Sequence, residues 1–149
     1  MIYLGSDHAG FKLKKSIVEW LSKKKIVFQD LGVSSETKKV DYPDYAFAVG
    51  RKVTEKKALG ILVCGTGAGV CIAANKVKGV RAVLVYSNQE AKNAKIHNNA
   101  NVLCFNAYKT KPKNAFGMIN AWLDAKFDSS ERRVKRLKKI SRFESKWLK

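Results

Sequence analysis

Residues 59–69, Leu-Gly-Ile-Leu-Val-Cys-Gly-Thr-Gly-Ala-Gly, decide the fold that this sequence predicts. The first six form a near-continuous apolar run, the pattern expected of a strand whose two faces are both covered by helices. The next five contain three glycines, and a helical pattern follows over residues 70–77. A buried strand, a tight turn and a helix in this order are the repeating unit of a parallel α/β sheet.

The same alternation extends outward from this unit in both directions. Further apolar runs occupy residues 2–5, 26–31, 81–86 and 101–105. Helical patterns fill the gaps over residues 13–21, 43–57, 88–97 and 114–126, and an apolar stripe from Val134 to Trp147 predicts a basic C-terminal helix over about 130–147. We therefore predict one domain over 1–149, an α/β, Rossmann-like, doubly wound sheet of five parallel strands with helices on both faces and an extended C-terminal helix.

Composition fits one domain with a real core but leaves a large positive charge to explain. The 149 residues are 46% hydrophobic, and 30 Lys and Arg against 12 Asp and Glu give a net charge of +18. Such an excess attracts nucleic acid, lipid head groups or phosphorylated metabolites. The alternative is a Lys-rich composition, with pairs such as Lys14-Lys15 and Lys56-Lys57 on solvent faces. Charge alone does not choose among these.

The sequence shows no pattern typical of a membrane-spanning helix, a leader peptide or a cysteine-based metal site. No apolar run approaches the roughly 20 residues of a membrane-spanning helix, and the first ten residues do not resemble a leader peptide. The three cysteines have no Cys-x-x-Cys spacing. We expect a cytoplasmic protein that has no contact with membranes, no disulfide framework and no zinc site.

Ligands of doubly wound sheets lie beyond the carboxyl ends of the strands, so the loops there are where chemistry is expected. Asp7 and His8 directly follow the first strand and offer acid, base or anion-binding roles. The alternative is that Asp7 caps the next helix and His8 is a surface residue.

The glycine-rich loop over residues 65–69 can turn backbone N–H groups toward an anion. It lacks both the dinucleotide fingerprint and the Gly-Lys-Ser/Thr ending of a phosphate-binding P-loop. Cys64 directly precedes it, in a setting that lowers a thiol pKa and makes a thiolate base or nucleophile possible. Cys71 and Cys104 are interpreted as inert buried thiols.

Two candidates lie away from those loops. His97 ends the helix before the fifth strand, where its near-neutral pKa suits proton transfer, although it could merely complement the helix dipole. Arg132 and Arg136, spaced i, i+4, share one helix face and could grip a phosphate, although a solvated basic face is the alternative.

Three motifs in order resemble the ribose-5-phosphate isomerase B family, whose wider group includes galactose-6-phosphate isomerase. They are Gly-x-Asp-His-x-Gly after the first strand, Cys-Gly-Thr-Gly-x-Gly with Ile-Ala-Ala-Asn-Lys after the third, and His-Asn-x-x-Asn-Val-Leu before the fifth. The resemblance extends from Gly5 through Arg136. It implies a metal-independent aldose-ketose isomerase without cofactors, which interconverts ribose 5-phosphate and ribulose 5-phosphate in the pentose phosphate pathway.

The resemblance also implies a role for each site residue. Cys64 would move the proton between C1 and C2 through an enediolate, and Thr66 with the amides of Gly65, Gly67, Ala68 and Gly69 would stabilise the oxyanion. His97 would open the sugar ring, Asp7 and Asn98 would hold hydroxyls, Tyr42 would line the pocket, and His8, Arg132 and Arg136 would bind the phosphate. A homodimer or tetramer with the active site at the subunit interface is implied as well.

Departures from the family pattern leave alternatives open. Some members carry a glutamate base where this chain has Val70, so Cys64 is the expected base here. Tyr108 and Lys109 stand near the place of a common arginine, and Asn106 replaces a glycine, which leaves sugar discrimination open. The alternatives are an isomerase of galactose 6-phosphate or allose 6-phosphate and, from another class, a basic nucleic-acid-binding module. No recognised binding motif or aromatic interleaving supports the latter.

Overall fold

Five apolar runs form one parallel sheet in a computed structural model that describes residues 1–148. The strands are β1 (Ile2–Ser6), β2 (Phe28–Asp30), β3 (Leu59–Cys64), β4 (Ala82–Leu84) and β5 (Val102–Asn106), and their order in the sheet is β2-β1-β3-β5-β4. The predicted doubly wound α/β fold is thus confirmed.

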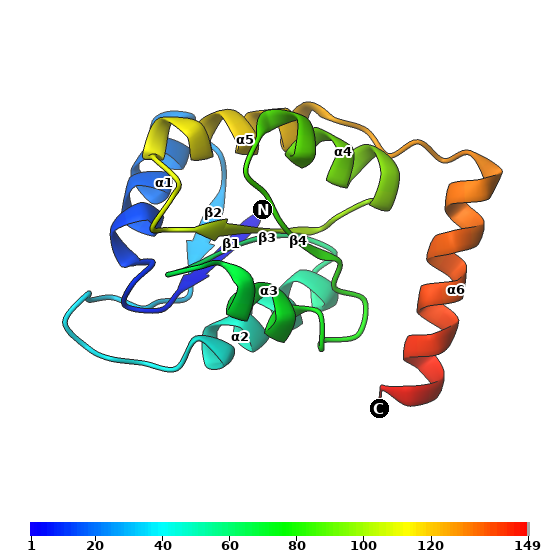
Figure 1. Cartoon of the computed structure of the whole chain (residues 1–149), viewed down its shortest axis with the longest axis horizontal. Helices are drawn as coiled ribbons and strands as arrows, with labels where there is room; N and C mark the ends of the chain where they lie inside the picture. The colour runs from blue at the N-terminus through cyan, green and yellow to red at the C-terminus, as the bar shows by residue number, and fades with distance from the viewer. Residues whose placement is uncertain (149) are drawn as a thin grey trace.

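Helices cover both faces of this sheet (Figure 1). Because side chains alternate along a strand, each central strand feeds two cores. Ile61 and Val63 of β3 face α1 (Phe11–Lys23), α4 (Asn88–Asn98) and α5 (Pro112–Asp124), whereas Leu62 and Cys64 face α2 (Tyr42–Glu55) and α3 (Ala68–Ala74). Both faces of β3 are therefore apolar, which explains its unbroken hydrophobic pattern.

The observed elements differ from the prediction mainly at the sheet edges and at the end of α3. β2 and β4 are edge strands of three residues each, shorter than the apolar runs that predicted them. Helix α3 ends at Ala74 because the next residue, Asn75, turns its side chain to β4: its amide donates to Ala82 O at 2.9 Å and accepts from Ala82 N at 2.9 Å.

Helix α6 (Glu131–Trp147) stands apart from the two helical layers, on the side of the sheet where α4 ends and β5 begins (Figure 1). Its one buried residue is Glu144, which accepts a hydrogen bond from the Gly79 amide at 3.2 Å. The second half of the apolar stripe that predicted the helix is exposed, with 48% of Ile140, 63% of Phe143 and 62% of Trp147 accessible to solvent, whereas Val134 and Leu137 are half-buried.

The winding direction of the chain reverses between β1 and β3. From β1 the chain moves outward to β2, and from β3 it moves the other way, while Ser6 and Val63 remain paired at the carboxyl ends. Ligands of such folds bind at this switch point. None of the helices over residues 1–148 has the length and apolar character needed to cross a membrane.

Candidate active site

Cys64 ends β3 at the switch point, with 4% of its surface exposed. Its Sγ accepts a hydrogen bond from the Gly67 amide at 3.1 Å. Gly67 has φ +78°, and a Cβ added there would lie 2.8 Å from the Phe105 carbonyl carbon. A glycine is therefore required for the backbone to turn its N–H toward this sulfur. The loop fixes a buried thiol beside a backbone N–H donor.

Two tyrosines flank the glycine loop. A Cβ added at Gly69 would lie 2.7 Å from the ring of Tyr42, and one added at Gly65 would lie 2.6 Å from the ring of Tyr108. The Tyr108 amide also donates to Gly65 O at 3.1 Å. Thr66, at the tip of the loop between them, is exposed. Tyr42 and Tyr108 thus lie on either side of the glycine loop, and the role of Tyr42 in lining a substrate pocket stays a prediction.

Asp7 and His8 lie on the neighbouring loop. Asp7 is buried, and its Oδ1 accepts from the Gly10 amide at 2.8 Å in the turn before α1. Gly10 is the N-cap residue of α1 and no side chain caps this helix, so the interpretation of Asp7 as a helix cap is wrong. Its Oδ2 has no hydrogen-bond partner within residues 1–148 and can accept from a ligand hydroxyl. His8 accepts from the Val40 amide at Nδ1, 3.4 Å away, which puts the proton of a neutral ring on Nε2.

Lys14 was predicted to face solvent as part of a lysine pair, and this prediction is wrong. The side chain is 1% exposed, because Lys14 shares the apolar face of α1 with Ile17 and Leu21. Its Nζ donates to Val33 O at 2.9 Å and pairs with Asp30 at 2.6 Å. This contact holds the start of the segment over residues 31–41, which connects β2 to α2. The same segment carries Val40, whose amide donates to His8, and it ends at Tyr42. The i, i+3 spacing from Lys14 to Ile17 was the signal available in the sequence.

His97 and Asn98 lie exposed at the end of α4. The helix begins at the carboxyl edge of β4 and runs back toward the amino edge of β5, about 16 Å for its 11 residues. Cys64 lies at the carboxyl edge. Within one chain the structure therefore does not bring His97 and Asn98 to the thiol.

Arg133, which the sequence analysis did not select, joins α6 to the end of α4. Its Nη1 donates to Ile96 O at 3.0 Å, and its Nε pairs with Asp128 at 3.0 Å. Arg132 and Arg136 lie in the same first turns of α6 and are exposed. The predicted residues thus form two groups: the strand-end group, comprising Asp7, His8, Tyr42, Cys64 and residues 65–69, and the helix-end group, comprising His97, Asn98, Arg132 and Arg136.

The other two cysteines differ from each other. Burial raises the pKa of Cys104, in keeping with an inert thiol. Cys71 is half-buried, and a hydrogen bond with Cys104 lowers its pKa to about 7, so its interpretation as inert is not supported. Among residues 1–148, no three His, Cys, Asp or Glu side chains gather closely enough to hold a metal ion.

Known proteins resemble this chain in sequence and in fold. The sequence model of the Ribose/Galactose Isomerase family matches residues 2–140. A probable ribose-5-phosphate isomerase B of Mycoplasma genitalium is 46% identical over 145 residues, which cover 96% of this chain and 95% of the relative.

Solved structures agree over the whole length. Ribose-5-phosphate isomerase B of Mycoplasma genitalium with bound ribulose 5-phosphate has a TM-score of 0.91 and 44% identity, covering 97% of this chain and 95% of that one. The enzyme of Clostridium thermocellum has a TM-score of 0.94 at 36% identity, with 98% of each chain covered. This chain, with its thiol held at the switch point, belongs to the ribose/galactose isomerase family.

Proposed function

We propose that the protein interconverts ribose 5-phosphate and ribulose 5-phosphate, with Cys64 as the base. The observation that carries this proposal is the buried Cys64 sulfur held by the Gly67 amide at 3.1 Å, at the edge where doubly wound sheets bind ligands. Family membership and the relative solved with ribulose 5-phosphate support the substrate. The three free thiols fit the reducing cytoplasm, where we place the reaction.

The chemistry requires a base and a place for negative charge. Open-chain ribose 5-phosphate loses a proton from C2 to the Cys64 thiolate, which gives an enediolate with the negative charge on O1. The thiol then returns the proton to C1 while a proton passes from O2 to O1, which leaves the C2 carbonyl of the ketose. Thr66 and the amides of the glycine loop stabilise the oxyanion, because fixed donors need no reorganisation as charge develops. Asp7 Oδ2 accepts from a sugar hydroxyl, and His8 binds the phosphate.

The helix-end group completes the site from a second chain. Ring opening by His97, hydroxyl binding by Asn98 and phosphate binding by Arg132 and Arg136 need these groups next to Cys64, and one chain holds them at the other edge of its sheet. The exposed apolar stripe of α6 supplies surface that a partner chain can bury. We therefore propose a homodimer in which each active site uses both chains.

The first experiment measures turnover with the metal-chelated protein. Ribose 5-phosphate, allose 6-phosphate and galactose 6-phosphate are supplied separately, and the corresponding ketose phosphate is followed. We expect turnover of ribose 5-phosphate, its loss in Cys64→Ala, and its retention in the matched control Cys71→Ala. Preference for a six-carbon sugar would keep the mechanism and change the substrate, whereas full activity of Cys64→Ala would remove the proton-transfer role.

Shared sites are tested by mixing two inactive variants. Cys64→Ala and His97→Gln homodimers each lack one group in every site, but a hybrid dimer has one complete site. Random exchange of subunits should therefore restore about a quarter of the wild-type activity. No recovery after verified exchange would show that each site is built from one chain.

A further inference from the structure

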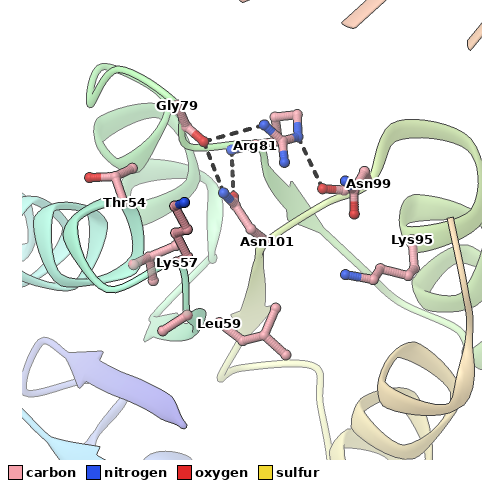
Figure 2. Close-up of a pocket in the computed structure, with 10 residues that line it drawn as sticks. Thr54, Lys57, Leu59, Gly79, Arg81, Lys95, Asn99 and Asn101 are labelled. Atoms are coloured by element: carbon pink, nitrogen blue, oxygen red, sulfur yellow. Dashed lines mark hydrogen bonds between the residues drawn. The ribbon is translucent and has the colours of Figure 1, made fainter. Parts of the chain in front are cut away.

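A cleft of about 340 Å³ opens at the amino edge of the sheet, opposite the edge that carries Cys64. It lies among the connections that lead from the ends of α2, α3 and α4 to the starts of β3, β4 and β5. The residues that matter here are Lys57, Gly79, Arg81, Lys95, Asn99 and Asn101, and we call this place the amino-edge cleft (Figure 2). Its volume is in the range of small-molecule sites.

Three cations from three different connections meet at the amino-edge cleft. Lys57 stands on the α2 side, Arg81 leads into β4, and the Lys95 ammonium points inward from α4 (Figure 2). No Asp or Glu lines the cleft among residues 1–148. Glu144 lies outside the lining, accepts a hydrogen bond from the Gly79 amide and interacts electrostatically with Arg81. The lining itself therefore carries three positive charges, and Glu144 offsets part of the charge of Arg81.

The Arg81 guanidinium is fixed in place. Its Nε donates to Asn99 O at 3.0 Å and its Nη1 to Gly79 O at 3.4 Å, while Asn101 bonds the Arg81 amide at 2.7 Å. Nη2 has no acceptor within residues 1–148, and neither does Nζ of Lys57 or Lys95. Burial, and then repulsion from Arg81, lowers the pKa of Lys95. A bound anion would offset the repulsion between the two cations.

We propose that the amino-edge cleft is an anion site for phosphate-bearing ligands, separate from the isomerase active site. A guanidinium with free N–H groups and two flanking ammonium groups matches a phosphate that carries two negative charges. The half-buried position of Arg81 excludes part of the solvent, so screening is weaker than on an open lysine surface. Such a site uses part of the +18 charge that the isomerase activity leaves unexplained.

The competing explanation is that these cations only balance helix dipoles. α2 and α4 end at this edge, and cations near a helix C-terminus are stabilising without any ligand. In that case, replacing the lysines lowers stability, but the wild-type protein does not bind phosphate there. The two explanations thus predict different results for the same titration.

The test is an NMR titration of the ¹⁵N-labelled full chain with inorganic phosphate and then pyrophosphate. Amide shifts of Lys57, Gly79 and Arg81 report on the cleft, and those of Gly65 and Gly67 report separately on the active site. Lys57→Gln/Lys95→Gln is compared with a matched control, Lys56→Gln/Lys92→Gln. Both double variants lose two charges on the same two segments, and the control lysines are exposed and outside the cleft.

We expect saturable shifts of the cleft amides in the wild type and the control, and binding weaker by about tenfold or more in Lys57→Gln/Lys95→Gln. The active-site amides should respond alike in all three proteins. An absence of saturable shifts at the cleft in the wild type, with or without a lower stability of the double variant, overturns the proposal. Equal weakening in the control overturns it too, because net charge alone then explains the binding.

Discussion

Replacing Gly67 by alanine tests whether the glycine loop positions Cys64. At φ +78° an L side chain costs about 1 to 2 kcal/mol. The added Cβ would also lie 2.5 Å from Leu84 Cδ1 and 2.9 Å from the backbone nitrogen of Asn106. Leu84 can rotate away, but β5 lies inside the sheet and cannot, so the loop must shift, at a further cost of about 1 to 3 kcal/mol.

The sum, about 2 to 5 kcal/mol, leaves a domain of this size folded but lowers its Tm by roughly 5 to 20 °C. Because the shift moves the Gly67 amide that Cys64 accepts from, we expect activity with ribose 5-phosphate to fall by about 100-fold or more. Urea unfolding and initial rates measure the two effects separately.

Gly79→Ala is the matched control. Gly79 has φ +84°, yet an added Cβ meets only Thr54, at 3.3 Å and beyond. We expect it to cost about 1 to 2 kcal/mol and to leave the turnover rate unchanged. Equal destabilisation by the two substitutions would refute the clash argument. Normal turnover in Gly67→Ala would refute the role of its amide.

Three further predictions concern residues around the site. Arg133→Ala removes the hydrogen bond that joins the start of α6 to Ile96. We therefore expect kcat/KM to fall by about tenfold or more in steady-state kinetics, while the unfolding midpoint in urea changes little. Unchanged kinetics would show that Arg133 is dispensable. Cys71, with a pKa of about 7 against an ordinary 9.0, should show a thiolate absorbance step near pH 7 that is missing in Cys71→Ser. Since this pKa is lowered by folding, the free energy of unfolding should rise between pH 7 and 9 more in the wild type than in the variant, and equal slopes would contradict the shift. Lys14→Met leaves Val33 O without its donor and should cost about 1 to 3 kcal/mol in urea unfolding; no loss would mean that the contact is not stabilising.

The central strands could be predicted from the sequence, and the edge strands only in outline. β3 matches its predicted bounds because residues such as Ile61 and Leu62 alternate between two cores, which makes the run apolar throughout. β2 is predicted too long because its flanking residues, Ile26 and Leu31, pack against the two cores but lie outside the paired register, although the Leu31 amide still donates to Leu4 O at 2.8 Å. Apolar character reports burial, and only hydrogen bonding decides where a strand ends.

Site residues that follow a strand directly were easier to predict than those that act through contacts across the chain. Asp7 and Cys64 need only their place at a strand end, which a sequence pattern shows. Arg133 acts on Ile96, 37 positions away, and a basic helix offers no sign of which of its arginines turns inward. Tyr108 is 74% exposed, and its contact with Gly65 depends on the close approach of two loops.

The direction of α4 explains why the two groups of site residues are separated within one chain. A helix that connects parallel strands must start at the carboxyl edge of one strand and end at the amino edge of the next. His97, one residue before the end of α4, therefore lies far from the edge where Cys64 ends β3. The shared site that we propose would remove this conflict, because α6 extends beyond the sheet and joins the end of α4 through Arg133, where a second chain can reach both helices. The exposed side chains of Phe143 and Trp147 offer a surface that such a partner could bury.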